Sequence, residues 1–586
     1  MEMQEKHFRG YKLYDDQNAF TLEFGGFRGF NARAQGALYK QAHAAAFDLM
    51  DKIERLENVN VTKHPTESEN RPVDHYNLRM EREVQGRSLA KSVALWNSVK
   101  AFAKKCIDAK EYDHVIYNGI GGSYLGPYLL LTAKYGDDFN MVLQTKGMPT
   151  AHFVANTDPT SFAQVIELVT GGAVLAQGTK VVDATNAAKK LERTLMVVIS
   201  KSGGTAETAT NCATFLTLLK DLRVANPGHS LVAVTTEDSK LDKQAKEQQF
   251  RETFHMNEAT GGRTSVCSAV GMVPAAFAGI DFEAFLVGMS EMDKLTRSHR
   301  EDPMQNPAIA YATLLDWMLK DKSTPFNLIL LAYLDPLKHL SHYCQQLFME
   351  SLGKNYTREA LPLKTGLTIL GGTGTGEQHA FMQQIQKGCS DAAVQLIRCR
   401  KRAADYSDAA AGSMGRQLLA FVKGTEMALY QNERAFVCIT IDGFCERCIG
   451  QLIAFEERVV TILGAFWNIN AFDQPGVQDG KLACLVCNKL SKEIELCIAQ
   501  CCGQRKTCKG TAPELLEALG VTAKAEVAGP YADVEHEDIT AWMADAIFED
   551  IVANCDTPGA YPSLAGRLAC SKTWNNKAFT YSFARK

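Results

Sequence analysis

MVVISKSGGT, residues 196–205, joins a short apolar run to a turn rich in glycine and hydroxyl side chains. A helical pattern begins directly after it, near Ala206. An apolar run of this length, closed by a glycine turn and followed by a helix, predicts a strand–turn–helix unit. Because the run shows no polar alternation, we expect the strand to be buried on both faces, as in a parallel sheet covered by helices.

The same unit recurs along the chain. His114–Tyr117 predicts a strand that is followed by the turn Gly119–Ser123 and by a helix from about Leu125. Leu231–Val234 predicts a third strand. The pattern then starts again in the second half of the chain, with strands predicted at residues 328–331, 367–370 and 436–440.

These units predict an α/β fold with two tandem sandwiches of parallel sheet and helices, divided near residues 295–310. We expect the first sandwich over residues 101–295 and the second over residues 310–490. Residues 1–100 form an N-terminal segment with a long helical pattern over 31–56, and residues 491–586 form a C-terminal extension. Both extensions are expected to be helical, and the sequence assigns no role to the second.

Composition limits the classes of partner. The chain has 586 residues, of which 46% are hydrophobic and 22% charged, as in ordinary globular proteins with more than one domain. Its formal net charge of −4 gives no electrostatic basis for binding nucleic acid or an anionic membrane. The first residues lack the apolar run of a signal peptide, and no stretch has the length of a membrane helix. We therefore expect a cytoplasmic protein.

The 17 cysteines are numerous, but their odd number argues against a disulfide framework. CERC at 445–448 and CLVC at 484–487 have the spacing of zinc ligands. Both pairs are expected on helices or at helix ends, where such residues share a face, so buried reduced thiols are the favoured interpretation. The same interpretation applies to Cys497, Cys501, Cys502 and Cys508. His339 and His342, with Glu350 further on, do not have HExxH spacing and are interpreted as an ordinary helix face.

Two glycine-rich turns are the candidate ligand contacts. In such sheets, ligands lie beyond the C-terminal ends of the strands, where helix N-termini present free N–H groups. Ser200–Thr205 offers three hydroxyls and two glycines at such a point, which suits a phosphate. It lacks the Walker A pattern, and Gly119–Ser123 is not a GxGxxG motif, so a nucleotide is disfavoured. Either turn alone fits a plain tight connection equally well; the two together favour phosphate.

A carboxylate and an imidazole follow in the second half. FMESLGK, residues 348–354, carries Glu350 on a predicted helix, and GTGEQHA, residues 374–380, carries His379 behind a glycine-rich turn. Together in a pocket, such groups can move a proton between carbons and open a sugar ring. Considered alone, Glu350 would be interpreted as an acidic residue on a helix surface, and His379 as a helix cap.

Seven ordered segments resemble the glucose-6-phosphate isomerase family, whose members contain two sugar-isomerase (SIS) domains. The matching segments are residues 71–79, 119–127, 200–208, 261–271, 349–354, 374–381 and 472–481. The chain departs from the family at Gly203 and Gly204, where Phe-Thr or Thr-Thr is frequent, and at Tyr124, where aspartate is common. Beyond about Leu490 the resemblance is weak.

The resemblance implies a role for each site residue. Glu350 would carry the proton between C1 and C2, and Arg263 would stabilise the enediolate. His379 and Lys481 would assist ring opening, and no metal or organic cofactor would be required. The remaining contacts would be Ser200, Lys201 (through its backbone N–H), Ser202, Gly203, Gly204 and Thr205 at the phosphate, Gly122 and Ser123 on the sugar side, and Gln346 and Gln474 at the hydroxyls. Glu207 would at most orient other groups.

The resemblance also implies an assembly and a pathway. Family members are homodimers, in which His379 would reach the partner's active site, and they convert glucose 6-phosphate to fructose 6-phosphate in glycolysis and gluconeogenesis. Two alternatives remain open. One is a dual phosphoglucose/phosphomannose isomerase, which the small Gly203-Gly204 turn leaves possible. The other is a non-catalytic SIS-domain regulator that binds phosphosugars, which would have no need of the four catalytic candidates.

Overall fold

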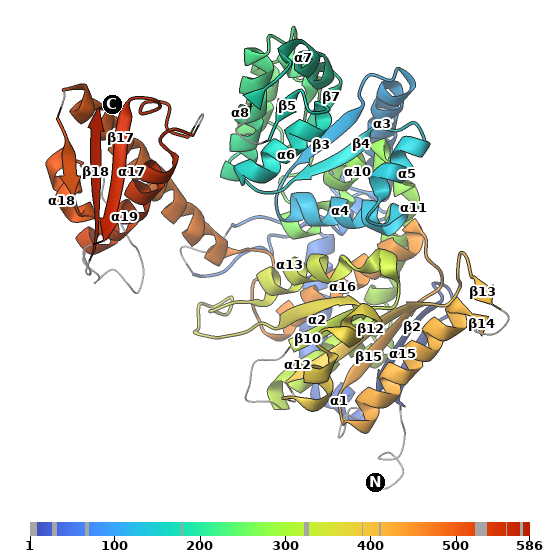
Figure 1. Cartoon of the computed structure of the whole chain (residues 1–586). Helices are drawn as coiled ribbons and strands as arrows, with labels where there is room; N and C mark the ends of the chain where they lie inside the picture. Colours follow the sequence, from blue (N-terminus) through green and yellow to red (C-terminus); the bar gives the residue numbers. More distant parts are fainter. Residues whose placement is uncertain are drawn as a thin grey trace. The chain divides into compact units, whose positions relative to one another are not determined.

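The computed structural model describes residues 9–25, 32–64, 69–176, 180–321, 327–389, 391–408, 412–504, 506–521, 536–557, 560–574 and 578–585. The chain forms two compact units. The first unit comprises residues 1–173 and 183–473, and the second comprises residues 174–182 and 474–586. Figure 1 labels the elements of both units.

The first unit contains a five-stranded parallel sheet with the order β4-β3-β7-β8-β9. All six residues of β7 are buried, so the strand predicted from MVVI is covered on both faces. The strands predicted near residues 114, 196 and 231 are confirmed as β3, β7 and β8, whereas β4 and β9 were not predicted. The bounds are β3 His114–Asn118, β4 Thr150–Val154, β7 Thr194–Ile199, β8 Leu231–Thr235 and β9 Glu252–His255.

A second, six-stranded sheet of this unit has the order β1-β2-β15-β12-β10-β11. Strands β15, β12, β10 and β11 are parallel, and the hairpin β1–β2 adds to β15 in antiparallel fashion. The N-terminal segment, expected to be helical, thus also supplies two strands. The bounds are β1 Arg9–Asp15, β2 Phe20–Gly25, β10 Asn327–Ala332, β11 Thr368–Thr373, β12 Ala392–Cys399 and β15 Phe436–Ile441.

Helices connect and cover the strands, so the predicted α/β class with two mainly parallel sheets is confirmed (Figure 1). Helices α11 and α16 pack along one another between the two halves of the unit. The helical pattern over 31–56 divides at Tyr39 into α1 and α2. The bounds are α1 Ala32–Leu38, α2 Lys40–Glu54, α3 Leu89–Asp108, α4 Gly122–Tyr135, α5 Phe139–Thr145, α6 Pro159–Val169, α7 Ala184–Glu192, α8 Ala206–Asp221, α9 Lys240–Glu247, α10 Ala269–Phe277, α11 Phe282–Arg297, α12 Pro307–Asp321, α13 Leu340–Leu352, α14 Met382–Lys387, α15 Met414–Gln431 and α16 Glu446–Phe466.

The second unit has its own apolar core, which includes Ile494, Leu515, Phe548 and Tyr581. Its antiparallel sheet has the order β16-β18-β17, so the extension expected to be helical also contains strands. The bounds are α17 Pro475–Gly503, β16 Cys508–Gly510, α18 Ala512–Leu519, α19 His536–Asn554, β17 Leu568–Trp574 and β18 Phe579–Arg585, with a small hairpin of β5 Val174–Leu175 and β6 Lys180–Val181.

The cysteines of the second unit correct one expectation. Cys501 and Cys508, interpreted as reduced thiols, form a disulfide. The chain turns back between the end of α17 and the start of β16, and seven residues of separation do not reveal this approach. In the described part of the chain, no helix combines the length and the apolar character needed to cross a membrane.

Candidate active site

Glu350 and Arg263 are in direct contact. Glu350 lies near the C-terminal end of α13, and Arg263 lies in the 3-10 helix Gly262–Cys267. Glu350 Oε2 is 3.0 Å from Arg263 Nε, and the side chains are 27% and 4% exposed, respectively. The carboxylate therefore reaches solvent, whereas the guanidinium beside it is enclosed by protein.

Further contacts fix the Arg263 guanidinium. Its Nη1 donates to Ser351 Oγ at 3.1 Å and to the Ala471 carbonyl at 3.2 Å, and its Nη2 donates to the Asp473 carbonyl at 3.0 Å. Burial lowers the pKa of Arg263, while the nearby Glu350 and Asp473 carboxylates act in the opposite direction. Because arginine stays protonated at working pH even when buried, this site holds a fixed positive charge next to Glu350.

The first glycine-rich turn lies against the same residues. Gly121 has a φ of +57°, and a Cβ there would lie 2.9 Å from Gln346 Nε2. A Cβ on Gly122 would lie 1.9 Å from the Gly262 carbonyl oxygen, so only glycine fits. Gln346 in turn donates to Glu350 Oε1 at 3.3 Å. The turn before α4, Gln346 and the Glu350–Arg263 pair thus form one cluster, and Ser123 lies in the first turn of α4.

Lys354 also belongs to this cluster, although the sequence analysis gave it no role. Its Nζ donates to the Glu350 carbonyl at 2.6 Å and to the Asp473 carbonyl at 3.0 Å, and lies 3.4 Å from Asp473 Oδ1. Burial and the charge of Arg263 lower the pKa of Lys354 to about 8, and burial raises the pKa of Asp473. In the sequence, the only indication of a role for Lys354 was its position four residues after Glu350.

The second glycine-rich turn connects β7 to α8. Ser200 directly follows the strand, and its Oγ donates to Thr205 Oγ1 at 3.3 Å. Ser202 Oγ accepts from the backbone N–H of Gly204 at 3.1 Å. Thr205 is the N-cap of α8 and makes no capping hydrogen bond with its side chain. Three hydroxyls therefore gather at the N-terminus of a 16-residue helix, which is a favourable position for an anion.

Both the backbone carbonyl and the side-chain amine of Lys201 make polar contacts. Its carbonyl accepts from the hydroxyls of Thr235 and Thr236 at 3.1 and 2.9 Å. Its Nζ lies 3.5 and 3.4 Å from the carbonyls of Glu258 and Thr260. Burial, and then the charge of Arg71, lower the pKa of Lys201 to about 8. The ammonium group is thus turned toward backbone carbonyls.

The remaining predicted residues are His379, Gln474 and Lys481. His379 ends the 3-10 helix Gly376–His379 and is exposed, and its side chain makes no hydrogen bond or ion pair with any described residue. Gln474 is the N-cap of α17 in the second unit. Lys481 also lies on α17, and its side chain falls outside the described part of the chain.

Comparison with known proteins gives the family. A family model described as phosphoglucose isomerase matches residues 31–420 and 417–499. A glucose-6-phosphate isomerase of Citrifermentans bemidjiense is 35% identical over 461 residues, covering 77% of this chain and 80% of that protein. One from Prochlorococcus marinus (strain NATL2A) is 31% identical over 466 residues, covering 78% and 82%. The chain belongs to the phosphoglucose isomerase family.

Solved structures agree on the fold of this phosphoglucose isomerase family member. A glucose-6-phosphate isomerase from Chlamydia trachomatis superposes with a TM-score of 0.66 at 24% identity, covering 82% of this chain and 89% of that chain. A hypothetical protein from Thermus thermophilus gives a TM-score of 0.60 at 23% identity, covering 77% and 95%.

Two of the three positions that depart from the phosphoglucose isomerase family, Gly203 and Tyr124, have a local explanation. Gly203 has a φ of +66°, and a Cβ there would lie 2.3 Å from the backbone nitrogen of Leu241, so the turn requires glycine. Tyr124 packs on the rings of Tyr128 and Phe153, with centroids 5.2 and 5.7 Å apart. The tyrosine therefore contributes to an aromatic cluster.

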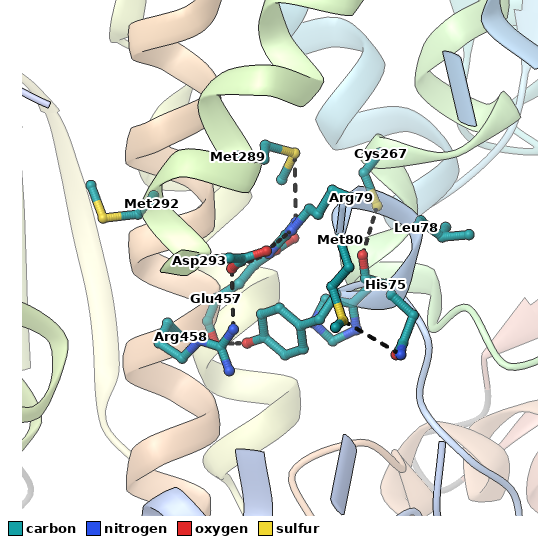
Figure 2. Close-up of polar contacts among 12 residues, drawn as sticks. His75, Leu78, Arg79, Met80, Cys267, Met289, Met292, Asp293, Glu457 and Arg458 are labelled. Atoms are coloured by element: carbon teal, nitrogen blue, oxygen red, sulfur yellow. Dashed lines mark hydrogen bonds and ion pairs between the residues drawn. The ribbon is translucent and has the colours of Figure 1, made fainter. Parts of the chain in front are cut away.

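This phosphoglucose isomerase family member also contains a buried ionic cluster (Figure 2). Arg79 Nε lies 2.5 Å from Asp293 Oδ2, and Arg79 Nη1 lies 2.6 Å from Glu457 Oε2. Arg458 Nη2 lies 3.2 Å from Asp293 Oδ1. The cluster thus ties the 71–79 segment to α11 and α16, a role the sequence analysis did not predict.

His75 is close both to this cluster and to Arg263. It lines a cavity of about 20 Å³ together with Arg263, Ser351 and Glu457. Burial, and then the charges of Arg79, Arg458 and Arg263, lower the pKa of His75 well below its usual value. The imidazole is therefore neutral.

No group of three or more His, Cys, Asp or Glu side chains in the described ranges is arranged to hold a metal ion.

Proposed function

We infer that this protein catalyses the reversible isomerisation of glucose 6-phosphate to fructose 6-phosphate through an enediolate intermediate. The contact of Glu350 Oε2 with Arg263 Nε at 3.0 Å carries the inference. It pairs a solvent-reaching carboxylate with a fixed cation, the two groups required for proton transfer next to a carbonyl. Membership of the phosphoglucose isomerase family supports the choice of substrate.

Glu350 is proposed to take the proton from C2 of the aldose and return it to C1. One carboxylate suits both steps because the two carbons are neighbours. Arg263 is proposed to stabilise the negative charge that develops on the enediolate oxygens, without giving up a proton. Gln346, which already bonds Glu350 Oε1, orients the carboxylate and contacts a sugar hydroxyl.

The turn between β7 and α8 is proposed to hold the 6-phosphate. The hydroxyls of Ser200, Ser202 and Thr205 would donate to it, as would backbone N–H groups of Lys201, Gly203 and Gly204. The N-terminus of α8 adds a favourable dipole. Gly122 and Ser123 would line the sugar side, next to Gln346. Binding at this distance from C1 and C2 positions the reacting carbons.

Ring opening is proposed to use His379 and Lys481, with Gln474 at the sugar hydroxyls. The exposure of His379 supports a role in a neighbouring active site, and we propose a homodimer in which His379 reaches the partner's site. The family places the reaction in glycolysis and gluconeogenesis, and we propose a cytoplasmic location. Each proposed role uses a side chain or backbone group of the chain and no metal or cofactor.

Of the alternatives, the dual phosphoglucose/phosphomannose isomerase rested on the small Gly203-Gly204 turn. The close approach of Leu241 accounts for Gly203, so the turn gives no independent support for a wider pocket. A non-catalytic phosphosugar-binding protein has no need of the Glu350–Arg263 pair.

The test is a coupled assay on the purified full chain. Fructose 6-phosphate is supplied with a chelator, and glucose 6-phosphate is detected by an NADP-dependent dehydrogenase. Turnover in the wild type and its loss in a folded Glu350→Gln variant are expected. A folded wild type without turnover would overturn the proposal, and a parallel assay with mannose 6-phosphate tests the dual specificity.

A further inference from the structure

The CERC segment lies at the start of α16, with its two cysteines in unequal surroundings. Cys445 is the N-cap of this 21-residue helix and is exposed, whereas Cys448, one turn further on, is buried. Their sulfur atoms are 3.5 Å apart. Two cysteines three residues apart at a helix start are within the span that a disulfide bridges.

Two ion pairs hold this helix start in place. Arg447, between the cysteines, donates to both carboxylate oxygens of Glu291 on α11, at 2.7 and 2.9 Å. Glu446 accepts from Lys134 on α4 at 2.6 Å. The sulfur atoms are therefore brought together by a backbone that is fixed on both sides.

The two thiols differ in acidity. The hydrogen bond with Cys448, and then the peptide N–H groups of Cys448 and Arg447, lower the pKa of Cys445 to about 6, although burial and the charge of Glu446 oppose this. The same hydrogen bond and burial raise the pKa of Cys448. Thiolates rather than thiols attack disulfides, so the exposed member of the pair is the reactive one.

Two other cysteine pairs lack either the position at a helix N-terminus or the exposed thiol of low pKa. Cys484 and Cys487 have the same CxxC spacing, but they lie inside α17, away from its N-terminus. Cys555 and Cys570 lie with their sulfurs 3.4 Å apart, yet Cys555 is buried, and burial raises the pKa of Cys570 to about 12. Spacing and proximity occur elsewhere, but only the CERC pair combines them with an exposed thiol at a helix N-terminus among the described cysteines.

We propose that Cys445 and Cys448 form a thiol–disulfide exchange site for small-molecule disulfides. The Cys445 thiolate attacks one sulfur of the disulfide, forming a mixed disulfide and releasing the first thiolate. Cys448 then loses its proton to solvent and attacks Cys445, closing the intramolecular disulfide and releasing the second thiolate. The pair is oxidised by two electrons, and the small disulfide is reduced to two thiols.

The test uses the full-length, reduced protein and oxidised glutathione at pH 6. At this pH about half of Cys445 is thiolate, whereas an ordinary thiol is less than about 1% ionised. A thiolate of low pKa is intrinsically less nucleophilic, which offsets part of this difference in ionisation. Cys445 is therefore expected to react with oxidised glutathione roughly tenfold faster than an ordinary thiol. Samples are quenched with acid, alkylated and mapped by mass spectrometry without reduction. The expected product is the Cys445–Cys448 disulfide, formed faster than any product at Cys484 or Cys570.

Variants separate the two steps. Cys448→Ser should accumulate one glutathione on Cys445, and Cys448→Ala serves if serine is not tolerated in the buried position. Cys445→Ser should leave Cys448 unmodified. The proposal would be overturned if Cys445 in the wild type reacted no faster than Cys484, or if it kept glutathione instead of passing the bond to Cys448.

Discussion

Glu350 Oε2 and Arg263 Nε lie 3.0 Å apart, and the other nitrogens of the same guanidinium are held by Ser351 Oγ and by the carbonyls of Ala471 and Asp473. The cation cannot turn away without breaking several hydrogen bonds. The base and the group that stabilises the anion are therefore fixed relative to one another before any substrate arrives.

Arg263→Lys should lower kcat by about two to three orders of magnitude, the usual effect of removing an oxyanion-stabilising donor. A lysine keeps the charge but cannot donate to Glu350, Ser351 and two carbonyls at once. Steady-state kinetics with fructose 6-phosphate measures this. Arg358→Lys is the matched control, because Arg358 also donates to backbone carbonyls, those of Ile469 and Val59, but forms no ion pair with Glu350. Equal losses of kcat in both variants would indicate a packing defect.

Gly203→Ala should raise the KM for the sugar phosphate about tenfold, roughly the loss of one hydrogen bond to a charged group. Gly203 has a φ of +66°, and a Cβ there would collide with Leu241 at the start of α9 and push the turn away from that helix. Gly204→Ala is the control, since its Cβ would meet only Ser202 Oγ at 3.3 Å. If Gly204→Ala raised KM as much as Gly203→Ala, the collision would not be the cause.

Mixing inactive Glu350→Gln and His379→Ala proteins under subunit exchange should restore part of the activity. In a homodimer with shared sites, one site of the heterodimer receives both an intact Glu350 and an intact His379. The recovered rate is measured after a denaturation and refolding step, with each variant treated alone as the control. Heterodimers that form, as shown by mass spectrometry, and stay inactive would contradict the shared site.

His43 should make folding sensitive to acid. It is 2% exposed, and burial lowers its pKa from 6.5 to about 4. Between these values the unfolded chain binds the proton and the folded protein does not, so stability is present above pH 6.5 and is lost as the pH falls toward 4. The loss is on the order of 3 kcal/mol.

Denaturant titrations at several pH values test this prediction by comparing the wild type with His43→Gln. The difference in unfolding free energy between the two proteins should shrink as the pH falls through this window. His229→Gln, at an exposed histidine, should follow the wild type. A constant difference between wild type and His43→Gln across the window would show that His43 does not titrate there.

The strands that the sequence predicted are those with uninterrupted apolar runs. MVVI at 196–199 and LILL at 328–331 are buried on both faces, and uninterrupted apolar runs of this kind are not typical of loops. β9, at Glu252–His255, was missed because only one of its four residues is buried. The hairpin of β1 and β2 was missed, and its attachment to the sheet depends on β2 joining β15 across more than 400 residues, a pairing that no local pattern reveals.

For the site, local motifs predicted single residues but not their contacts. Glu350, Arg263 and Gln346 were predicted and lie together. Lys354 was overlooked because its position four residues after Glu350 does not reveal that it is buried beside Asp473. The Arg79–Asp293–Glu457 cluster joins three distant segments, and its members look like ordinary surface charges in the sequence.

The central claim is that Glu350 moves the proton, and hydrogen exchange in heavy water tests it most directly. The wild type should incorporate deuterium at C2 of glucose 6-phosphate, because the carboxylate exchanges its proton with solvent before returning it. Glu350→Gln should retain its fold and bind sugar phosphate, yet lose turnover and incorporation together, by about two to four orders of magnitude. A folded Glu350→Gln protein that incorporates deuterium at close to the wild-type rate would contradict the account and place the base elsewhere.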